Sequence, residues 1–416
     1  MTDTIRSIDE CRLCSGRDLL PYLDFGEVPL GNNLQESSEA AAAADVYPLR
    51  VRRCAECGHF QLGDAVDPAA LYATNYTYLS GIGPSFVRHF DAYADWVQER
   101  CDLPPDALVV DIGSNDGTCL KAFHSRGYRV CGVDPAELPA QIANRDGVET
   151  LHAFFDSGSA AEIVSRHGRA NFVTSHNVLA HVDDLAGTFR NIYALLQDGG
   201  HFAFEVGYFG DVLRSGCFDT IYHEHLDYHH ATSLARHLTG LGFELVDLST
   251  NSIQGGSLRL LLRKTGVGLV LPEAQRFLDL ERTSVLYDQQ FLDGWKQRIE
   301  QQMTQFNAIM AERAERGDLI VGYGAPTKAT LLMKLAGLDS RHVSFVVEDN
   351  ALKAGRFLPR TAVPIRPSAA LEGIEPDTLV VFAWNFANDI LHKLDGFFSA
   401  PVEVIIPLPE LRVETL

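Results

Sequence analysis

The sequence predicts an α/β protein in which two Rossmann-like halves follow a small N-terminal metal-binding segment. Three observations support this prediction. Four cysteines stand in two close pairs near the N-terminus, short apolar strands alternate with helical stretches from residue 107, and the same alternation begins again at residue 318. A chain of 416 residues also has room for two to four domains.

The composition narrows the class of protein. A hydrophobic content of 46% and a charged content of 22% are typical of a soluble globular chain. Against 55 Asp and Glu there are 35 Lys and Arg, and the resulting net charge of -20 argues against a nucleic-acid surface or docking on anionic lipid. Apolar runs stay short of about 18 residues, and the polar start lacks a signal-peptide core. We therefore expect no membrane span and a cytoplasmic location, with a monomer as the working oligomeric state.

The two cysteine pairs predict a structural zinc site. Cys11 and Cys14 form one C-x-x-C turn, and Cys54 and Cys57 form the other. Two thiolates at this spacing occupy two corners of a tetrahedron around zinc, so two pairs close the coordination shell. A redox pair would be expected once, beside a βαβ unit, which fits less well. The remaining cysteines are expected to be ordinary semi-buried thiols: Cys101, Cys119, Cys131 and Cys217.

Hydrophobic periodicity places the elements in order. A helix is expected at 85–101, where aromatic residues recur at helical spacing. Strands are expected in the first half at 107–112, 128–133, 171–175 and 201–206, and as an antiparallel pair at 243–248 and 257–263. After a charged helical stretch at 272–316, strands are expected at 319–323, 344–348, 378–383 and 402–406. We therefore divide the chain into a zinc-binding segment at 1–70 and α/β domains at 71–270 and 271–416.

A ligand-binding turn is expected in the first α/β half. Strand 107–112 runs into a turn in which Gly113 and Gly117 let the backbone approach a ligand without a Cβ clash. About twenty residues later, Asp134 ends the next strand, where an acid can accept hydrogen bonds from ribose hydroxyls. The G-x-N-x-G form differs from the G-x-G-x-x-G of dinucleotide sites, and a plain βα turn is the alternative.

This arrangement resembles class I S-adenosylmethionine (SAM) methyltransferases. Their first motif looks like 111–117, their fourth-strand motif like 175–184, and the turn before their fifth strand like 195–200. The resemblance implies SAM as the cofactor, with a nicotinamide cofactor as the alternative. The cofactor-binding residues that it implies are Gly113, Asn115, Asp116, Gly117, Asp134, Pro135, Phe155 and Asn177.

A histidine-rich insert follows the first half's fifth strand, with four histidines among residues 223–230. The H-E-x-x-H zinc pattern is absent, because His223-Glu224-His225 does not place two imidazoles on one helical face. Acid/base chemistry is favoured, since histidine titrates near neutrality and an adjoining carboxylate can orient it. A metal site and a solvated polar loop remain the alternatives.

The second half carries its own turn, Gly322-Tyr323-Gly324-Ala325-Pro326-Thr327-Lys328, between a strand and a helix. It is not a Walker A loop, because the G-K-[ST] order is missing. The helix start offers free N–H groups and Lys328 adds charge, while Lys353 and Arg356 follow the next strand. These bases are natural partners for a pyrophosphate, although an ordinary turn with solvated bases is the alternative.

All of these motifs together resemble the zinc-containing, SAM-dependent sugar C-3'-methyltransferases of antibiotic deoxysugar (tetronitrose-type) biosynthesis, over essentially the whole chain. The resemblance implies a substrate in which a thymidine diphosphate (TDP) carries a 4-keto-deoxysugar, with a 3-amino sugar favoured. The alternatives are an O- or N-methyltransferase and a non-catalytic SAM-binding module.

We expect His225 as the base and Glu224 as its orienter or substitute. Tyr222 and Tyr76 are expected as phenol donors, and His181 between cofactor and sugar. The substrate-binding residues expected are Asn32, Asn33, Tyr323, Lys328, Lys353, Arg356, Trp384 and Asn385.

Overall fold

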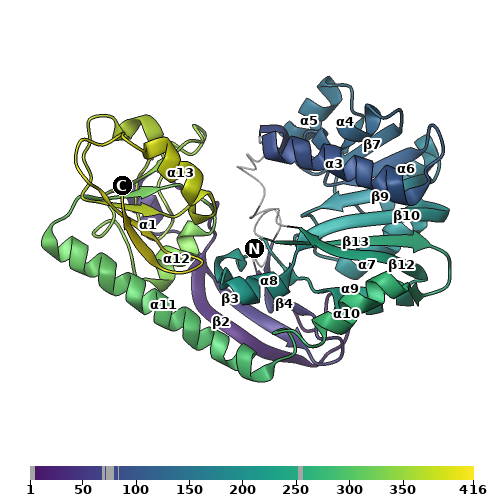
Figure 1. The fold of residues 1–416 in the computed structure, drawn as a ribbon, viewed down its shortest axis with the longest axis horizontal. Helices are drawn as coiled ribbons and strands as arrows, with labels where there is room; N and C mark the ends of the chain where they lie inside the picture. The colour runs from purple at the N-terminus through teal and green to yellow at the C-terminus, as the bar shows by residue number, and fades with distance from the viewer. Residues whose placement is uncertain (1–4, 68–70, 72–78, 83, 252–255) are drawn as a thin grey trace.

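The computed structural model describes residues 5–67, 71, 79–82, 84–251 and 256–416, without the side chains of 82, 84 and 85. The predicted phenol donor Tyr76 lies outside the described residues. The chain forms two α/β halves and an N-terminal β segment that lies against both (Figure 1). Within the described part, no helix is both long and apolar enough to cross a membrane.

The N-terminal segment is built on an antiparallel sheet of β2 (Leu19–Pro29), β3 (Val46–Cys54) and β4 (Phe60–Leu62). A strand from far along the chain, β11 (Asp227–Tyr228), pairs with β4 and completes this sheet. The histidine-rich insert therefore belongs to the same sheet as the zinc segment. Shorter elements at this end are β1 (Ile5–Ser7), which pairs with β5 (Asp64–Val66), and helix α1 (Ser38–Ala42).

The first α/β half contains a doubly wound sheet with strand order β14-β12-β13-β10-β9-β6-β7-β8 among the described residues. Five strands are parallel: β6 (Leu108–Ile112), β7 (Arg129–Asp134), β8 (Thr150–His152), β9 (Ala170–His176) and β10 (Leu196–Gly207). The predicted antiparallel pair is confirmed as β12 (Phe243–Asn251) and β13 (Ser257–Lys264), and the short β14 (Leu269–Val270) follows. Every residue of β6 is buried, as expected for a strand covered on both faces.

Helices cover both faces of this sheet (Figure 1). The helix predicted at 85–101 is confirmed as α3 (Pro84–Cys101). The crossover helices are α4 (Thr118–His124), α5 (Glu137–Arg145), α6 (Ser157–His167) and α7 (Leu185–Leu195). Beyond β10 lie α8 (Phe209–Ser215), the 3-10 turn η2 (Phe218–Thr220) and α9 (Ala231–Gly240), and a 3-10 turn η1 (Ser80–Ile82) precedes α3.

The long helical stretch predicted at 272–316 is interrupted. It consists of two helices, α10 (Pro272–Glu281) and α11 (Gln289–Arg316). The side chain of Asp288 accepts a hydrogen bond from the Phe291 amide and starts the second helix afresh. In the intervening turn, Leu286 is buried in the core, so the interruption is fixed by packing.

The second α/β half has strand order β17-β16-β15-β18-β19-β20. The predicted strands are confirmed as β15 (Ile320–Tyr323), β16 (Phe345–Glu348), β18 (Thr378–Val381) and β19 (Glu403–Ile406), with helices α12 (Ala329–Leu335) and α13 (Ala387–Leu394). Two further strands were not predicted from the apolar pattern, because they are short edge strands with little buried apolar surface: β17 (Ile365–Pro367) and β20 (Arg412–Thr415). Since β15 lies between β16 and β18, its carboxyl end is a topological switch point.

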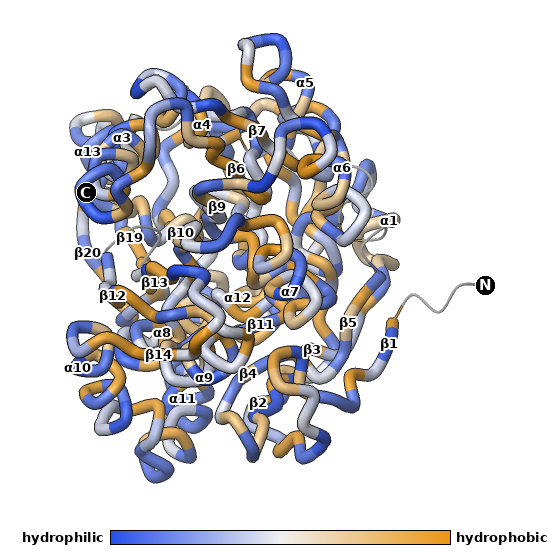
Figure 2. Tube along the Cα trace, turned by 90° about the vertical axis from the view of Figure 1, so that its right-hand side faces the viewer, coloured by the Kyte–Doolittle hydropathy of each residue, from blue (hydrophilic) through white to orange (hydrophobic). Residues whose placement is uncertain are grey.

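One buried core connects the three parts. It runs from Leu23 and Val51 in the N-terminal sheet through Phe204 and Trp295 to Leu332 in α12. Helix α11 runs along the underside of the second half toward β2 and β3 (Figure 1), where Trp295 stacks on Tyr22. Apolar stretches lie in the interior, as around β6, and hydrophilic stretches lie on the outside, as around α5 (Figure 2).

Candidate active site

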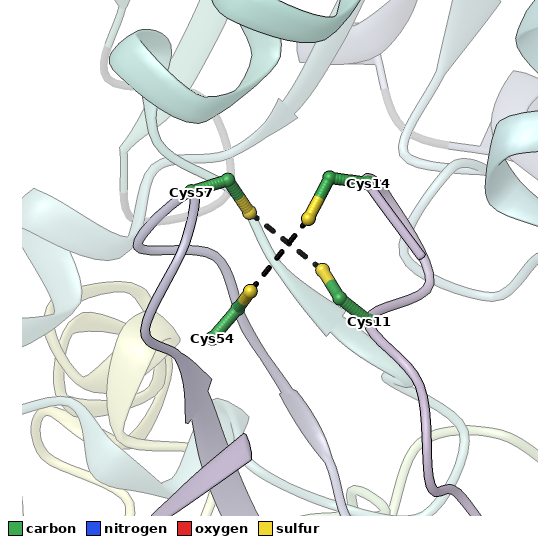
Figure 3. Close-up of side chains that lie close together, drawn as sticks. All are labelled: Cys11, Cys14, Cys54 and Cys57. Carbon is green, nitrogen blue, oxygen red and sulfur yellow. Dashed lines mark hydrogen bonds between the residues drawn. The ribbon is translucent and has the colours of Figure 1, made fainter. Parts of the chain in front are cut away.

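The four predicted zinc ligands converge on one point. The side chains of Cys11 and Cys14 face those of Cys54 and Cys57 across two opposed turns (Figure 3). The Sγ atoms of Cys11 and Cys57 lie 3.6 Å apart, as do those of Cys14 and Cys54. Zn–S bonds of about 2.3 Å in a tetrahedron require S–S distances of about 3.8 Å, so the four sulfurs fit zinc. A hydrogen bond with Cys57 and burial raise the pKa of Cys11, and a bound dication would instead favour its thiolate.

The zinc turns hold the histidine-rich insert through buried side chains. The Arg12 guanidinium, between the first two ligands, donates to Asp227 at 3.2 Å, and the other Asp227 oxygen lies 2.8 Å from His59 Nε2. In addition, His230 Nε2 lies 3.0 Å from the Gly58 carbonyl in the second zinc turn. Asp227 and His230 therefore have a structural role, and only part of the histidine-rich insert is available for chemistry.

The turn at residues 113–117, called the cofactor turn below, has the glycine backbone conformation that the sequence predicts. Gly113 and Gly117 both adopt positive φ, and a Cβ at Gly113 would come within 2.2 Å of the Val178 side chain. The Asp134 carboxylate accepts from the Asn115 and Ala136 amides, both at 2.8 Å. Burial raises the pKa values of Asp111 and Asp134. A bound SAM, which is cationic at its sulfonium and ammonium groups, would oppose this shift and favour the ionised carboxylates.

Other predicted cofactor residues take supporting positions. The side chains of Asn115 and Asp116 accept from the Ser80 and Gly81 amides, at 2.9 and 2.8 Å, and so bind η1 across the turn. Asn177 has a left-handed φ of 57° directly after β9. The Pro135 carbonyl contacts His152. Phe155 packs partly buried against the core, whereas its neighbour Phe154 is 60% exposed and is the freer ring of the pair.

A second group of metal-type ligands, His89, His176 and Glu205, lies beside α3. One Glu205 oxygen is 2.6 Å from His89 Nε2 and 3.2 Å from His176 Nδ1. The other oxygen forms a close ion pair with Arg259. Since the guanidinium already neutralises Glu205, this group is a hydrogen-bond network that holds α3 on the sheet beneath the cofactor turn.

The predicted base His225 is fixed at both ring nitrogens. Its Nδ1 lies 2.8 Å from the Thr220 carbonyl, which can only accept, so Nδ1 carries the proton. The Nε2 lone pair then accepts from the Tyr222 hydroxyl at 2.8 Å. The His181 ring packs edge-on at 4.8 Å. Burial lowers the pKa of His225 to about 3, so at neutral pH the imidazole is uncharged and can accept a proton.

The predicted pairing of Glu224 with His225 takes a different form. Glu224 accepts from the Asn32 side chain at 2.7 Å, and the Thr327 hydroxyl donates to Asn32 at 2.6 Å. A Cβ at Gly31 would come within 2.2 Å of the Thr327 carbonyl, which shows how closely the two segments approach. The orienting acceptor of His225 is thus the Thr220 carbonyl. Burial raises the pKa of Glu224 to about 7, within the range of a general base.

A second contact between the insert and the second half centres on Asp219. This buried carboxylate accepts from the Trp384 indole at 2.5 Å and lies 3.7 Å from the Lys328 ammonium. The ammonium also lies 4.1 Å from the centre of the Trp384 ring. Lys328 and Trp384 are therefore held together at the site, but part of the charge predicted for a diphosphate is balanced by Asp219.

Of the remaining predicted substrate residues, four lie in the second half and Asn33 lies in the N-terminal segment. The Tyr323 hydroxyl accepts from Lys393 at 2.8 Å and lies 3.2 Å from Asp349. Lys353 donates to the Ala325 carbonyl at 2.9 Å. The other three are Arg356, which pairs with Glu36 at 3.0 Å, and the exposed Asn33 and Asn385. Lys328, Lys353 and Arg356 thus each have a separate partner.

Comparison with known proteins accounts for nearly the whole chain. Three family models match in succession: "Putative zinc binding domain" at 11–72, "Methyltransferase domain" at 86–248 and "C-methyltransferase C-terminal domain" at 252–409. The C-methyltransferase NovU of Streptomyces niveus is 33% identical over 414 residues, which cover 99% of this chain and 98% of the relative.

The chain belongs to the C-methyltransferase family.

Two further matches each cover less than half of the chain. A ubiquinone biosynthesis O-methyltransferase of Saccharophagus degradans is 27% identical over 113 residues, covering 27% of this chain and 48% of the relative. Among solved structures, the SAM-bound magnesium protoporphyrin IX methyltransferase of Synechocystis covers 43% of this chain and 79% of its own, with 15% identity and a TM-score of 0.34.

Family membership confirms the prediction of a SAM-dependent methyltransferase. The zinc prediction is confirmed by the zinc-domain match together with the four converging cysteines. The structure brings together His225, Tyr222, His181, Glu224 and Asn32 from three distant segments. Three residues of the site were not predicted from the sequence: Thr220, Asp219 and Thr327. Their position, beside the insert or inside the Gly322–Lys328 turn, was the signal that could have indicated them.

Proposed function

We propose that this enzyme transfers a methyl group from SAM to C-3' of a TDP-linked 4-keto-deoxysugar, with a 3-amino sugar as the first substrate to test. The observation that carries this proposal is the Tyr222–His225–Thr220 arrangement. It presents an uncharged imidazole of fixed tautomer with a phenol beside it, and Asp219, next to Thr220, lies 3.7 Å from Lys328 of the second α/β half. Deprotonation of a carbon next to a ketone needs such a pair. One group takes the proton, and the other stabilises the negative charge that develops on the ketone oxygen.

In this proposal, His225 Nε2 takes the proton from C-3' once the substrate displaces the Tyr222 hydroxyl. The electron pair of the broken C–H bond moves onto the ketone oxygen as an enolate, to which Tyr222 can donate its hydroxyl hydrogen. When bound, SAM supplies an electrophilic methyl group, and the C-3' carbon forms the new bond as sulfur keeps the old bonding pair. The Thr220 carbonyl stabilises the imidazolium by accepting from Nδ1.

Glu224 is the alternative proton acceptor. Its raised pKa of about 7 makes it a stronger base than the buried imidazole, and the Asn32 amide holds its carboxylate in place. The two assignments differ in the pH dependence of kcat/KM. Loss of activity centred near pH 7 supports Glu224, whereas activity that persists far below pH 7 supports His225.

The function is tested by incubating the enzyme with SAM and a panel of TDP-4-keto-sugars. Mass spectrometry should show replacement of one hydrogen by a methyl group, and carbon NMR should place that methyl on C-3'. A methyl on oxygen or nitrogen would instead establish an O- or N-methyltransferase. Tight SAM binding without any methylated sugar would contradict the proposal and favour a binding module.

A further inference from the structure

The two α/β halves share a hydrogen-bond pattern at their ligand edges. In the first half, the Gly113 amide, directly after β6, donates to the Val133 carbonyl in β7 at 2.8 Å. In the second half, the Gly324 amide, directly after β15, donates to the Val347 carbonyl in β16 at 2.8 Å. Both glycines have positive φ, 70° and 83°. The turn that follows the first strand is therefore built alike in both halves.

Each of these glycines also lies very close to a residue just beyond the neighbouring strand. A Cβ at Gly113 would come within 2.2 Å of Val178, just beyond β9. A Cβ at Gly324 would come within 2.4 Å of Ala383, just beyond β18. Strands β9 and β18 occupy the same place, on the far side of the first strand from the second. Both turns thus lie at a switch point, where open α/β sheets bind ligands.

The correspondence extends to one acidic residue in each half. Asp134 ends β7 and accepts from the amide of Asn115 in the turn and from the amide two residues further on, both at 2.8 Å. Glu348 ends β16 and accepts from the Ala325 amide in its turn at 2.9 Å and from the Asn350 amide, two residues further on, at 3.0 Å. In each half, one carboxylate oxygen accepts from the turn after the first strand, and the other accepts from the amide two residues beyond the acid itself.

These bonds leave the carboxylates able to accept more. An ionised carboxylate has about four lone-pair sites, of which the two amides use one on each oxygen. The Glu348 side chain keeps 14% of its surface exposed, so a ligand can reach it. An acid in this position of a Rossmann half accepts from the sugar hydroxyls of a nucleoside.

One difference separates the halves. The Lys353 ammonium lies 2.9 Å from the Ala325 carbonyl and 3.7 Å from Glu348. At the matching edge of the first half, His152 contacts the Pro135 carbonyl at 3.1 Å. A fixed ammonium suits an anionic nucleotide, whereas a cationic ligand such as SAM has no need of one.

We propose that Glu348 is the nucleoside-binding acid of the second half and accepts a hydrogen bond from the 3'-hydroxyl of the substrate's deoxyribose. This inference rests on the proposed function, because a TDP-linked sugar supplies that deoxyribose. Glu348 was absent from the residues that the sequence pointed to. It adds a specificity residue to the nucleotide end of the site, which Lys353 serves from the diphosphate side.

The test is calorimetric binding of TDP and of its 3'-deoxy analogue to the full-length protein. Wild type should bind the 3'-deoxy analogue about tenfold more weakly than TDP, the loss typical of a hydrogen bond to a charged group. Glu348→Gln should weaken TDP binding by about tenfold and reduce the discrimination between the two ligands. SAM binding by the same variant should stay at the wild-type level, which checks that it has folded.

Asp134→Asn is the matched control in the other half. It should weaken SAM binding and leave TDP binding unchanged. Equal binding of TDP and its 3'-deoxy analogue to wild type would overturn the inference, and this comparison needs no variant that might misfold. Wild-type affinity of Glu348→Gln for TDP would overturn it equally. Failure of wild type to bind TDP at all would instead overturn the proposed function.

Discussion

His225 owes its chemical state to three neighbours rather than to its own residue type. The Thr220 carbonyl fixes the proton on Nδ1, the Tyr222 hydroxyl lies on Nε2, and burial holds the pKa at about 3. The other insert histidines have different surroundings. His223 lies 3.2 Å from the Tyr47 carbonyl, and His230 contacts a zinc turn. The same residue type is therefore the proposed base at one position and a structural anchor at others.

Replacing the proposed base should remove most of the activity. We expect His225→Asn to lower kcat by about a hundredfold or more, because an amide can accept a hydrogen bond but cannot take a proton. The measurement is methyl transfer at saturating SAM, with SAM binding as the check on folding. Turnover near the wild-type level would exclude His225 as the proton acceptor.

The ionisation of Glu224 should depend on Asn32. Burial raises the pKa of Glu224 to about 7, and the Asn32 amide holds it lower than burial alone would. If the ionised carboxylate is needed, kcat/KM falls as pH drops through about 7, and Asn32→Ala moves this fall upward by about one pH unit. The pH profiles of both proteins measure the effect. An identical acid limb in the two would show that another group titrates.

At the scale of elements, strand β11 decides where the insert lies. It is only two residues long, yet it pairs with β4, and its Asp227 is buried between Arg12 and His59. The zinc turns fix Arg12 and His59 in turn. The metal segment therefore stabilises the strand that directly follows Glu224, His225 and Leu226.

Breaking this buried pair should be costly. We expect Asp227→Ala to reduce the free energy of unfolding by about 3 kcal/mol, because the buried Arg12 would lose its fully buried carboxylate partner and keep only the half-exposed Asp183. The matched control is Arg6→Ala, which removes the largely exposed pair with Asp183 and should cost less than about 1 kcal/mol. Denaturant titration measures both. Equal losses would contradict the structural role of Asp227.

At the scale of the whole molecule, the site is assembled only where the three parts meet. Asn32 comes from the N-terminal segment, Glu224 from the insert and Thr327 from the second half, and hydrogen bonds join all three. The Asp219–Trp384 bond and the common core make the same connection. If the second half binds the nucleotide as proposed, the ligand would be linked to Glu224 through Thr327 and Asn32.

Substitution of Thr327 tests whether the second half is coupled to Glu224 through Asn32. Thr327→Val removes the hydroxyl that donates to Asn32 while keeping the shape, and we expect about a tenfold loss in kcat with unchanged SAM binding. Thr327→Ser keeps the hydroxyl and should retain most of the activity. Steady-state kinetics of the two variants give the comparison. Similar losses in both would point to packing rather than to the hydrogen bond.

The sequence by itself determined the features that are local along the chain. The zinc ligands follow from C-x-x-C spacing, the turn glycines and Asp134 from their place at strand ends, and the two sheets from alternating apolar runs. Each of these features is marked by residue types at a fixed spacing within a short segment, so the sequence alone indicates it. The short edge strands β17 and β20 were not predicted, because their pairing depends on the rest of the sheet.

Only the tertiary structure decided which polar groups meet. Glu224 and Asn32 are 192 residues apart, Arg12 and Asp227 are 215 apart, and Asn32 and Thr327 are 295 apart. Contacts of this range depend on how whole elements pack, and a pattern of residue types carries no record of that. The correspondence of Glu348 with Asp134 likewise appears only in the hydrogen bonds across each turn. The sequence thus determined the class of enzyme, and the packing of three parts decided which side chains meet at the proposed site.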